Sequence, residues 1–386
     1  AGVVQMFGAT SLEAGADANF ANNITLEAGS TATISSRGFV LRADGAIGEA
    51  AAGLGFTKTG AGTLILGVAN TFTGGVTVNE GIVDVRDAAS LGTGTATFNA
   101  GTTLRSGAGV TLANAIAVAG GVTVDTPELL ALGGNITGTG GITKTGTNGL
   151  ALNGNNNFTG GFALNAGQVT LGSDTGFGAD QVNVAGGTNG IVFTGSRTVA
   201  NNIDLAGATT LTVGTGNTAQ LDGVITGAGS IVTGDVGRLL LTNNGSTFGG
   251  GVSLTQGTLA LSANAAAGTG AITAAGGTTL ELIGGRTLAN GIVLNGGLSV
   301  QTNNLANQFD GVVSGAGGLT VLTTAGAPFG QALTLANPGN TFAGGLTIGA
   351  NANVRVSGDG ALGDVAGGVT AVSYTHLRAH ETKANL

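Results

Sequence analysis

The sequence predicts an all-β fold: a right-handed parallel β-helix, or β-solenoid, of about 17 three-stranded coils. Three observations favour this fold. A self-similar unit returns about every 88 residues, short apolar runs alternate with small polar residues, and glycine makes up 77 of the 386 residues. Period-two alternation indicates β-strands, whereas no apolar set keeps a helical spacing. The best helical candidate, Ala263 to Ala267, is too short to be stable alone.

Four related segments mark the repeat. Copies that read GFTKTGAGTLILGVANTFTGG and GITKTGTNGLALNGNNNFTGG begin at Gly55 and Gly141, and more divergent copies begin at Gly229 and Gly318. The last copy is longer by an insertion around Pro328. Each copy carries one phenylalanine near its end, and by subtraction these lie 86, 90 and 94 residues apart: Phe72, Phe158, Phe248 and Phe342. Repetition at a steady spacing is the signature of a repeat architecture.

Two further markers agree with this period. Segments of the type ANNI begin at Ala21, Ala113, Ala200 and Ala289, and glycine-rich segments of a second type begin at Asp44, Gly133, Asp222 and Asp310. We therefore predict one array over residues 1–371. Its complete units cover about 54–139, 140–227 and 228–316, and its partial units cover 1–53 and 317–371.

A unit of this length divides into four passes of roughly 22 residues, each with three strand-like runs. In the second complete unit the passes are Ile142 to Gly161, Phe162 to Gln181, Val182 to Ile203 and Asp204 to Gly227. Inward Val, Ile, Leu and Phe side chains are expected to stack on the next coil and bury a continuous core. Glycine and asparagine bound the runs because both tolerate the positive φ of tight corners. We expect the corner asparagines to stack in ladders.

Composition excludes several protein classes. Charged residues are 8% of the chain, against about 25% in ordinary globular proteins. The formal net charge of −8 argues against nucleic acid or an anionic membrane as partner. The absence of cysteine excludes a disulfide scaffold and a thiolate metal site. No apolar run is long enough for a transmembrane helix. Residues 1–15 lack a signal-peptide pattern, and we expect the chain to be an internal fragment of a longer protein.

Few residues could carry catalysis or bind a metal. His376 and His380 have the i, i+4 spacing of a metal pair on a helix, which would need a third ligand such as Glu381. They are the only histidines, and no HExxH motif contains them. Without them no Ser-His-Asp or Cys-His system can be assembled. The sequence therefore predicts no catalytic, cofactor-binding or metal site.

The carboxylates fit structural positions better than a site. Asp44, Asp222 and Asp310 occupy equivalent places before glycine in successive units, where aspartate is a turn residue. One unit apart, they would lie about four coils, or ~19 Å, from one another. Asp84 and Asp87 flank Arg86 in the densest charged cluster, which we interpret as a solvated corner. Two arginines recur at one position of the repeat and are interpreted as periodic decoration: Arg197 and Arg286.

Threonine pairs raise the possibility of a flat ice-binding array. Pairs of the type T-x-T occur at Thr57, Thr71, Thr95 and Thr143. These pairs do not recur at one-coil spacing in the sequence, so we expect no flat threonine array.

The pattern G-(I/F)-T-K-T-G-x-x-x-L-x-L-x-x-x-N-x-F-T-G-G, present at Gly55 and Gly141, resembles the autotransporter-associated β-strand repeat of type V secreted passenger domains. Two copies keep the K-T-G core, through Lys58 and Lys144, and the later copies are expected to have replaced the lysine by Val232 and Val321. The resemblance implies a parallel β-helix on the surface of a Gram-negative bacterium or released from it. It also implies a C-terminal outer-membrane barrel on the same polypeptide, which this sequence does not include.

The last residues depart from the repeat. The stretch 372–386 reads VSYTHLRAHETKANL, with no glycine, both histidines and the only tyrosine. We interpret it as a non-native tail derived from a sequencing adapter. A native capping segment is the alternative.

The favoured function is that of a non-enzymatic stalk of an autotransporter passenger, whose coils support outward secretion and present a distal adhesive or effector region. The alternative is a polysaccharide-binding or polysaccharide-cleaving β-helix, which would need a groove with two or three carboxylates on adjacent coils. A third possibility is adhesion to host or neighbouring cell-surface glycans or proteins. No cofactor and no nucleic-acid partner is expected.

Overall fold

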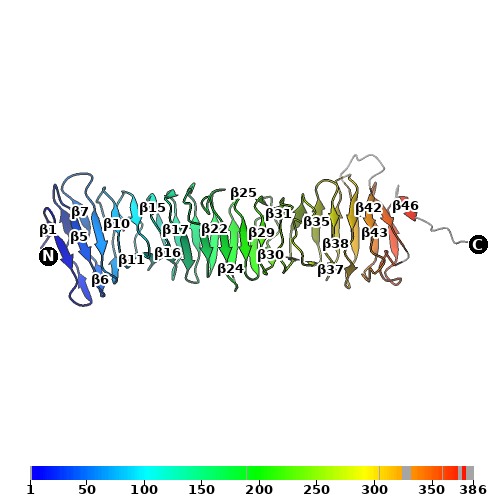
Figure 1. Cartoon of the computed structure of the whole chain (residues 1–386), viewed down its shortest axis with the longest axis horizontal. Coiled ribbons are helices and arrows are strands. Elements are labelled where there is room, and N and C mark those ends of the chain that lie inside the picture. The colour runs from blue at the N-terminus through cyan, green and yellow to red at the C-terminus, as the bar shows by residue number, and fades with distance from the viewer. Residues whose placement is uncertain are drawn as a thin grey trace, which may run out of the picture. The chain divides into compact units, whose positions relative to one another are not determined.

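The computed structural model describes residues 2–187, 189–303, 305–323, 332–358 and 360–372, together with the backbone of 376–379. Within these residues the regular elements are 46 β-strands and no helix (Figure 1). Residues 263–267 form bends and turns, in agreement with the sequence. Every strand pairing that the structure defines is parallel. The insertion around Pro328 lies outside the described residues.

The first compact unit holds residues 1–185 and 189–192, and its strands form four parallel sheets. Sheet A contains β1 (Val4–Met6), β4 (Ile24–Leu26) and β7 (Ile47–Glu49). Sheet B contains β2 (Ser11–Glu13), β5 (Ala32–Ser35), β8 (Phe56–Thr59), β10 (Val76–Val78), β12 (Ala96–Phe98), β15 (Ile116–Val118) and β18 (Ile136–Thr137).

Sheet C contains β3 (Ala18–Phe20), β6 (Val40–Ala43), β9 (Thr63–Leu66), β11 (Ile82–Val85), β13 (Thr103–Ser106), β16 (Val122–Asp125), β19 (Ile142–Thr145), β21 (Phe162–Leu164) and β23 (Val182–Val184). Sheet D contains β14 (Val110–Leu112), β17 (Leu130–Leu132), β20 (Leu150–Leu152), β22 (Gln168–Leu171) and β24 (Asn189–Phe193), whose last residue belongs to the second unit.

The second compact unit holds residues 186–188 and 193–386. The strands of sheet C that belong to this unit are β26 (Ile203–Leu205) and β29 (Ile225–Thr226), which pair with each other. Sheet E contains β25 (Arg197–Val199), β28 (Thr218–Leu221), β31 (Arg238–Leu241), β33 (Thr258–Leu261), β35 (Thr278–Leu282), β38 (Leu298–Gln301), β41 (Leu319–Leu322), β43 (Leu346–Ile348) and β45 (Val369–Ala371).

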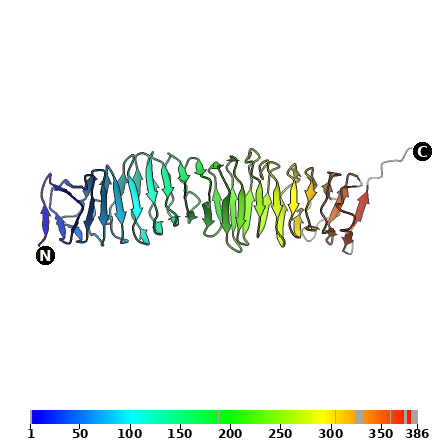
Figure 2. The same cartoon turned by 90° about the horizontal axis from the view of Figure 1, so that it is seen from below.

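Two more sheets complete this unit. Sheet F contains β36 (Thr287–Leu288), β39 (Asn307–Phe309), β42 (Ala332–Leu335), β44 (Asn353–Val356) and β46 (His376–Ala379). The strands of sheet D that belong to this unit are β27 (Thr209–Val213), β30 (Ile231–Gly234), β32 (Val252–Leu254), β34 (Ile272–Ala274), β37 (Ile292–Leu294) and β40 (Val313–Ser314). In both views, strands that are neighbours within a unit lie side by side (Figure 2).

Taken in chain order the strands make about 17 turns of a parallel β-solenoid, which confirms the predicted fold class. Successive coils are offset by about 20 residues, as when Val76 pairs with Ala96 and Ile142 with Phe162. The predicted three strands per coil hold for most coils. In each repeat, however, one side forms no strand in two successive coils, and two strands lie between these gaps: β10 with β11, β21 with β22, β32 with β33 and β43 with β44.

A glycine explains why the second of these sides forms no strand. Gly178 has a φ of +75°, which a strand cannot adopt, and a Cβ atom there would lie 3.0 Å from the ring of Phe158. The glycine therefore covers the phenylalanine ring of the preceding coil. The same pairing recurs in the other repeats, as Gly92 over Phe72, Gly268 over Phe248 and Gly363 over Phe342. All four phenylalanines are fully buried.

Buried asparagines join neighbouring coils, although not as the predicted side-chain ladders. The Asn156 Oδ1 accepts a hydrogen bond from the Ile136 N–H (2.8 Å) of the preceding coil, and its Nδ2 donates to the Gly176 carbonyl (2.7 Å) of the following coil. Asn70 and Asn340 make the equivalent pairs of bonds. In the third copy Ser246 fills this place, and its hydroxyl accepts from the Ile225 N–H. These buried asparagines thus bond to backbone, because the coil offset places a donor below them and an acceptor above. One exposed pair does stack as predicted, since the Asn99 Nδ2 donates to the Asn79 Oδ1 (2.7 Å) of the preceding coil.

We predict that Asn156→Ala destabilises the first unit by about 2–4 kcal/mol, because it leaves one buried N–H and one buried carbonyl unpaired. Asn156→Ser, which copies the natural residue Ser246, is expected to lose about half as much. Denaturant unfolding measures the loss of stability in both variants. Faster hydrogen exchange at the Ile136 amide shows that the loss arises at this site. Asn157→Ala at the exposed neighbouring position is the control. Unchanged exchange at Ile136 in Asn156→Ala would contradict the proposed bridge.

Candidate functional site

Two lysines lie inside the solenoid. Lys58 is on β8 and its side chain is fully buried. Its register partners in the neighbouring coils, Ile34 and Val78, are buried apolar residues, so its aliphatic part extends the apolar column of the core. Its Nζ donates to the carbonyls of Thr59 (3.0 Å) and Gly60 (2.6 Å) in its own corner, and to the Glu80 carbonyl (2.9 Å) in the following coil. All three ammonium protons therefore have acceptors.

Lys144 repeats this arrangement on β19. It is fully buried, and its register partners are the buried Val124 and Leu164. Its Nζ donates to the carbonyls of Thr145 (2.8 Å) and Gly146 (2.7 Å), and to the Ala166 carbonyl (2.9 Å) of the following coil. The sequence offsets from lysine to acceptor are the same in both copies. The K-T-G motif is therefore a way of burying an ammonium group against a corner whose glycine has positive φ.

Burial governs the protonation of both lysines. It lowers the pKa of Lys58 from its usual 10.5 to about 8, while the charge of Glu80 raises it. It likewise lowers the pKa of Lys144 to about 8, against the charge of Asp125. The cause is the loss of water around the charged form, which the carbonyl dipoles replace only in part.

The later copies replace the lysine differently from the sequence-based expectation. In the third copy Val232 is an outward position on β30, and Thr233 occupies the inward place equivalent to Lys144. The Thr233 Oγ1 donates to the Gln256 carbonyl (3.0 Å), the counterpart of the Ala166 carbonyl. This copy has one additional residue after Gly229. The position equivalent to the lysine therefore falls one residue later than the sequence-based alignment places it. In the fourth copy the predicted Val321 does lie at the inward place.

The acidic cluster is not the solvated corner that the sequence suggests. Asp84 is 4% exposed and pairs with Arg86 (Nε to Oδ1, 3.3 Å), and its register partner on the next strand is Arg105. Arg105 in turn pairs with Asp125 (Nε to Oδ2, 2.9 Å). Sheet C thus carries a row of alternating charges across successive coils. Asp87 lies at a turn, where its Oδ1 accepts from the Ala89 N–H.

The repeated aspartates and arginines behave as periodic decoration. Asp44, Asp222 and Asp310 each accept a hydrogen bond from the side chain two residues earlier, which is Arg42 (2.7 Å), Gln220 (2.9 Å) and Gln308 (2.6 Å), respectively. Arg197 and Arg286 donate to carbonyls of their own turns. No structural observation brings these aspartates together as a site.

The structure leaves the histidine hypothesis untested. His380 and Glu381 lie outside the described residues, and His376 is described only by its backbone in β46. Within the described part of the chain, no three His, Cys, Asp or Glu side chains are grouped so that they could hold a metal. The described residues also contain no helix that is long and apolar enough to cross a membrane.

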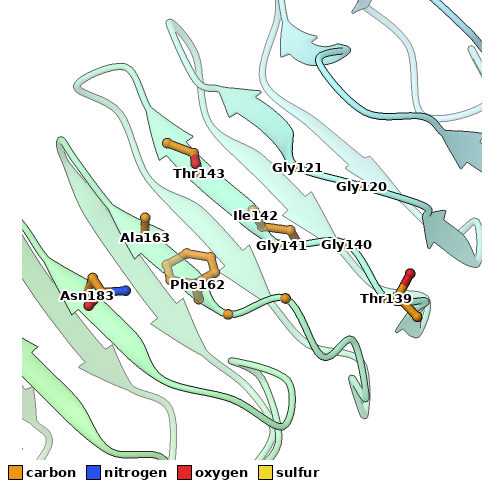
Figure 3. Close-up of a pocket in the computed structure, with 12 residues that line it drawn as sticks. Gly120, Gly121, Thr139, Gly140, Gly141, Ile142, Thr143, Phe162, Ala163 and Asn183 are labelled. Carbon is orange, nitrogen blue, oxygen red and sulfur yellow. The ribbon is translucent and has the colours of Figure 1, made fainter.

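A shallow groove crosses successive coils of the first unit. It has a volume of about 370 Å³, and three Gly-Gly corners line it: 120–121, 140–141 and 160–161. Ile142 and Phe162 also line it, together with the polar groups of Thr139, Thr143 and Asn183 (Figure 3). None of its twelve lining residues is charged. The groove therefore suits an uncharged, hydroxyl-bearing chain better than an ion.

Single threonines recur at one-coil spacing, although the T-x-T pairs do not. On sheet B the outward residues Thr33, Thr57, Thr77 and Thr97 are successive register partners, each half-buried. Their sequence spacings are 24, 20 and 20 by subtraction, because coil length varies, and this unevenness hid the column. Ala117 interrupts it before Thr137. A second column, Thr103, Thr123 and Thr143, lies on sheet C. Each column is only one residue wide, which is too narrow for a flat ice-binding array.

Comparisons with known proteins agree with this architecture. The passenger-associated-transport-repeat family model matches residues 56–85, 142–171 and 331–350. The first two matches contain the buried lysines. A relative, the adhesin BmaC autotransporter of Brucella suis biovar 1 (strain 1330), is 33% identical over 215 residues. The match covers 52% of this chain and 6% of the relative, so the chain spans a small part of that protein. No solved structure matches.

We predict that the ε-amines of Lys58 and Lys144 titrate near pH 8, well below an ordinary lysine. Between about pH 8 and 10.5 the unfolded chain then binds more protons than the folded chain, so stability should rise with pH across this window. NMR of the lysine Cε and Nζ nuclei measures the titration. Denaturant unfolding at several pH values measures the rise, which the double variant Lys58→Met, Lys144→Met should lack. An equal rise in that variant would refute the assignment.

Proposed function

Because the chain is a segment of an autotransporter passenger built from passenger-associated-transport repeats, we propose that it is a non-enzymatic stalk that presents a distal adhesive or effector region. One observation carries the proposal. Within each unit, coil after coil repeats the same parallel register over one apolar core, so coils can be added without altering the core. The relative's name as an adhesin supports a surface-exposed or secreted location in a Gram-negative bacterium.

The same stacking supports a role in secretion. Each coil that docks outside the cell buries apolar side chains and pairs backbone groups with the coil before it, so backward movement of the chain would have to break these contacts. We infer a C-terminal outer-membrane translocator on the same polypeptide as the partner in this process. Glycans or proteins of host or neighbouring cells are the inferred partners of the displayed region.

We predict that deletion of residues 140–227 from the full-length gene lowers the amount of passenger on the cell surface and shortens the stalk by about four coils, or ~19 Å. Surface protease accessibility measures the first effect, and electron microscopy of the released passenger measures the second. In the matched control a second copy of residues 54–139 replaces the deleted unit. We expect it to restore both the surface display and the length of the stalk. Unchanged surface display after the deletion would exclude the secretion role.

Polysaccharide binding is the second candidate, and the uncharged groove of the first unit favours it. Polysaccharide cleavage gains no such support. The groove contributes no carboxylate, and on sheet C the nearby Asp84 and Asp125 are each neutralised by an arginine. A cleaving enzyme needs a free acid and base on either side of the scissile bond.

If the groove binds a neutral polysaccharide, the triple variant Thr139→Val, Thr143→Val, Asn183→Ala should weaken binding by roughly tenfold or more, because it removes three hydrogen-bonding groups. Retention on a panel of an immobilised glucan, mannan and galactan, followed by calorimetry, measures the loss. Thr103→Val and Thr123→Val, on the same sheet outside the groove, are the controls. If the parent protein is retained by no member of the panel, this candidate fails.

A further inference from the structure

We propose that Lys58 and Lys144 fix the stacking register of the array: each lysine permits only one alignment of the following coil. The inference rests on the two buried ammonium sites, and it concerns how the repeats fold correctly, whatever the stalk displays.

The repeat creates a register problem. Most strands are three or four residues long, and apolar residues of different sizes face one another across the coils, such as Val76 and Val78 opposite Ala96 and Phe98. A slip of one residue would turn every inward side chain outward, but a slip of two residues keeps the inward set inward. The apolar core therefore excludes odd slips strongly and even slips weakly.

The buried ammonium groups discriminate against even slips. Each takes two acceptors from its own corner and its third from the following coil, the Glu80 carbonyl for Lys58 and the Ala166 carbonyl for Lys144. A two-residue slip moves that carbonyl by about 6.6 Å along the strand, beyond hydrogen-bond reach. A fully buried charge would then lack one of its acceptors, which is far less favourable than a mismatched apolar contact.

The two sites support one another because they recur with the same geometry in different coils. Their acceptors lie one, two and 22 residues after the lysine in both cases. In the third copy Thr233 keeps only the bond to the following coil, and in the fourth copy Val321 keeps none. A buried polar group that fixes register at a cost in stability is an established use of such groups.

The chain contains no cysteine, so introduced pairs report register without interference. Thr57 and Thr77 are outward register partners, and the pair Thr57→Cys, Thr77→Cys should form a disulfide in the native alignment. The pairs Thr57→Cys, Asn79→Cys and Thr59→Cys, Thr77→Cys should form one only after a two-residue slip in either direction. Each pair is placed in the parent and in Lys58→Met, unfolded and refolded under reducing conditions, then oxidised and quantified by mass spectrometry of peptides.

In the parent background only the native pair should cross-link. In Lys58→Met the two slipped pairs together should rise by about tenfold or more over the parent, while the protein stays folded by circular dichroism. Ile34→Met, at the register partner of Lys58 in the preceding coil, is the matched control and should behave as the parent.

Lys144→Met tests the second site in the same way. Its native pair is Thr143→Cys, Ala163→Cys, and its slipped pair is Thr143→Cys, Asn165→Cys. The proposal is overturned if the methionine variants form native cross-links alone, as Ile34→Met should. It is also overturned if they fail to fold, since the lysines would then be required for stability and not for register.

Discussion

Stacking of parallel coils at one-strand spacing is the constraint on which the rest of this structure depends. Each coil completes its backbone hydrogen bonds only through its neighbours, and at ~4.8 Å from them it has no room for an unmatched polar group. Buried polar residues therefore bond across coils, as Asn156 does with the coils on both sides and Lys144 with the coil that follows. The same close spacing explains the glycine that covers each repeated phenylalanine, such as Gly178 over Phe158, because a side chain there would clash with the ring.

The sequence predicted those features that depend on local pattern. Period-two alternation predicted strands whose inward Val, Ile, Leu and Phe side chains form a core, and the repeat spacing marked the four phenylalanines that the structure buries. The third side of the coil after each phenylalanine was harder to predict. Whether a glycine such as Gly178 ends a strand depends on a positive φ that its contact with Phe158 in the preceding coil imposes, and no local pattern records that contact.

The buried lysines could have been recognised from the same alternation. In the run from Phe56 to Thr59 the inward positions are the first and third, so period two already places Lys58 in the core. Its charge suggested a surface position and obscured that signal. Asp84 differs, because it pairs with Arg86 and has as its register partner another arginine, Arg105, 21 residues later. Register partners in successive coils lie between 19 and 27 residues apart by subtraction, so such partners cannot be assigned from sequence alone.

The inward and outward residues of each coil are therefore under different constraints. Inward residues are constrained by the neighbouring coils, and a change there must be matched above and below. Outward residues have no such requirement, and in the first unit they diverge: sheet C carries the Arg105–Asp125 pair, whereas the Thr57 column and the groove are uncharged. If the lysines secure the alignment from within, the outer faces are free to vary without loss of register. An array of this kind can change what it contacts while keeping its fold, which is the property that a displayed stalk requires.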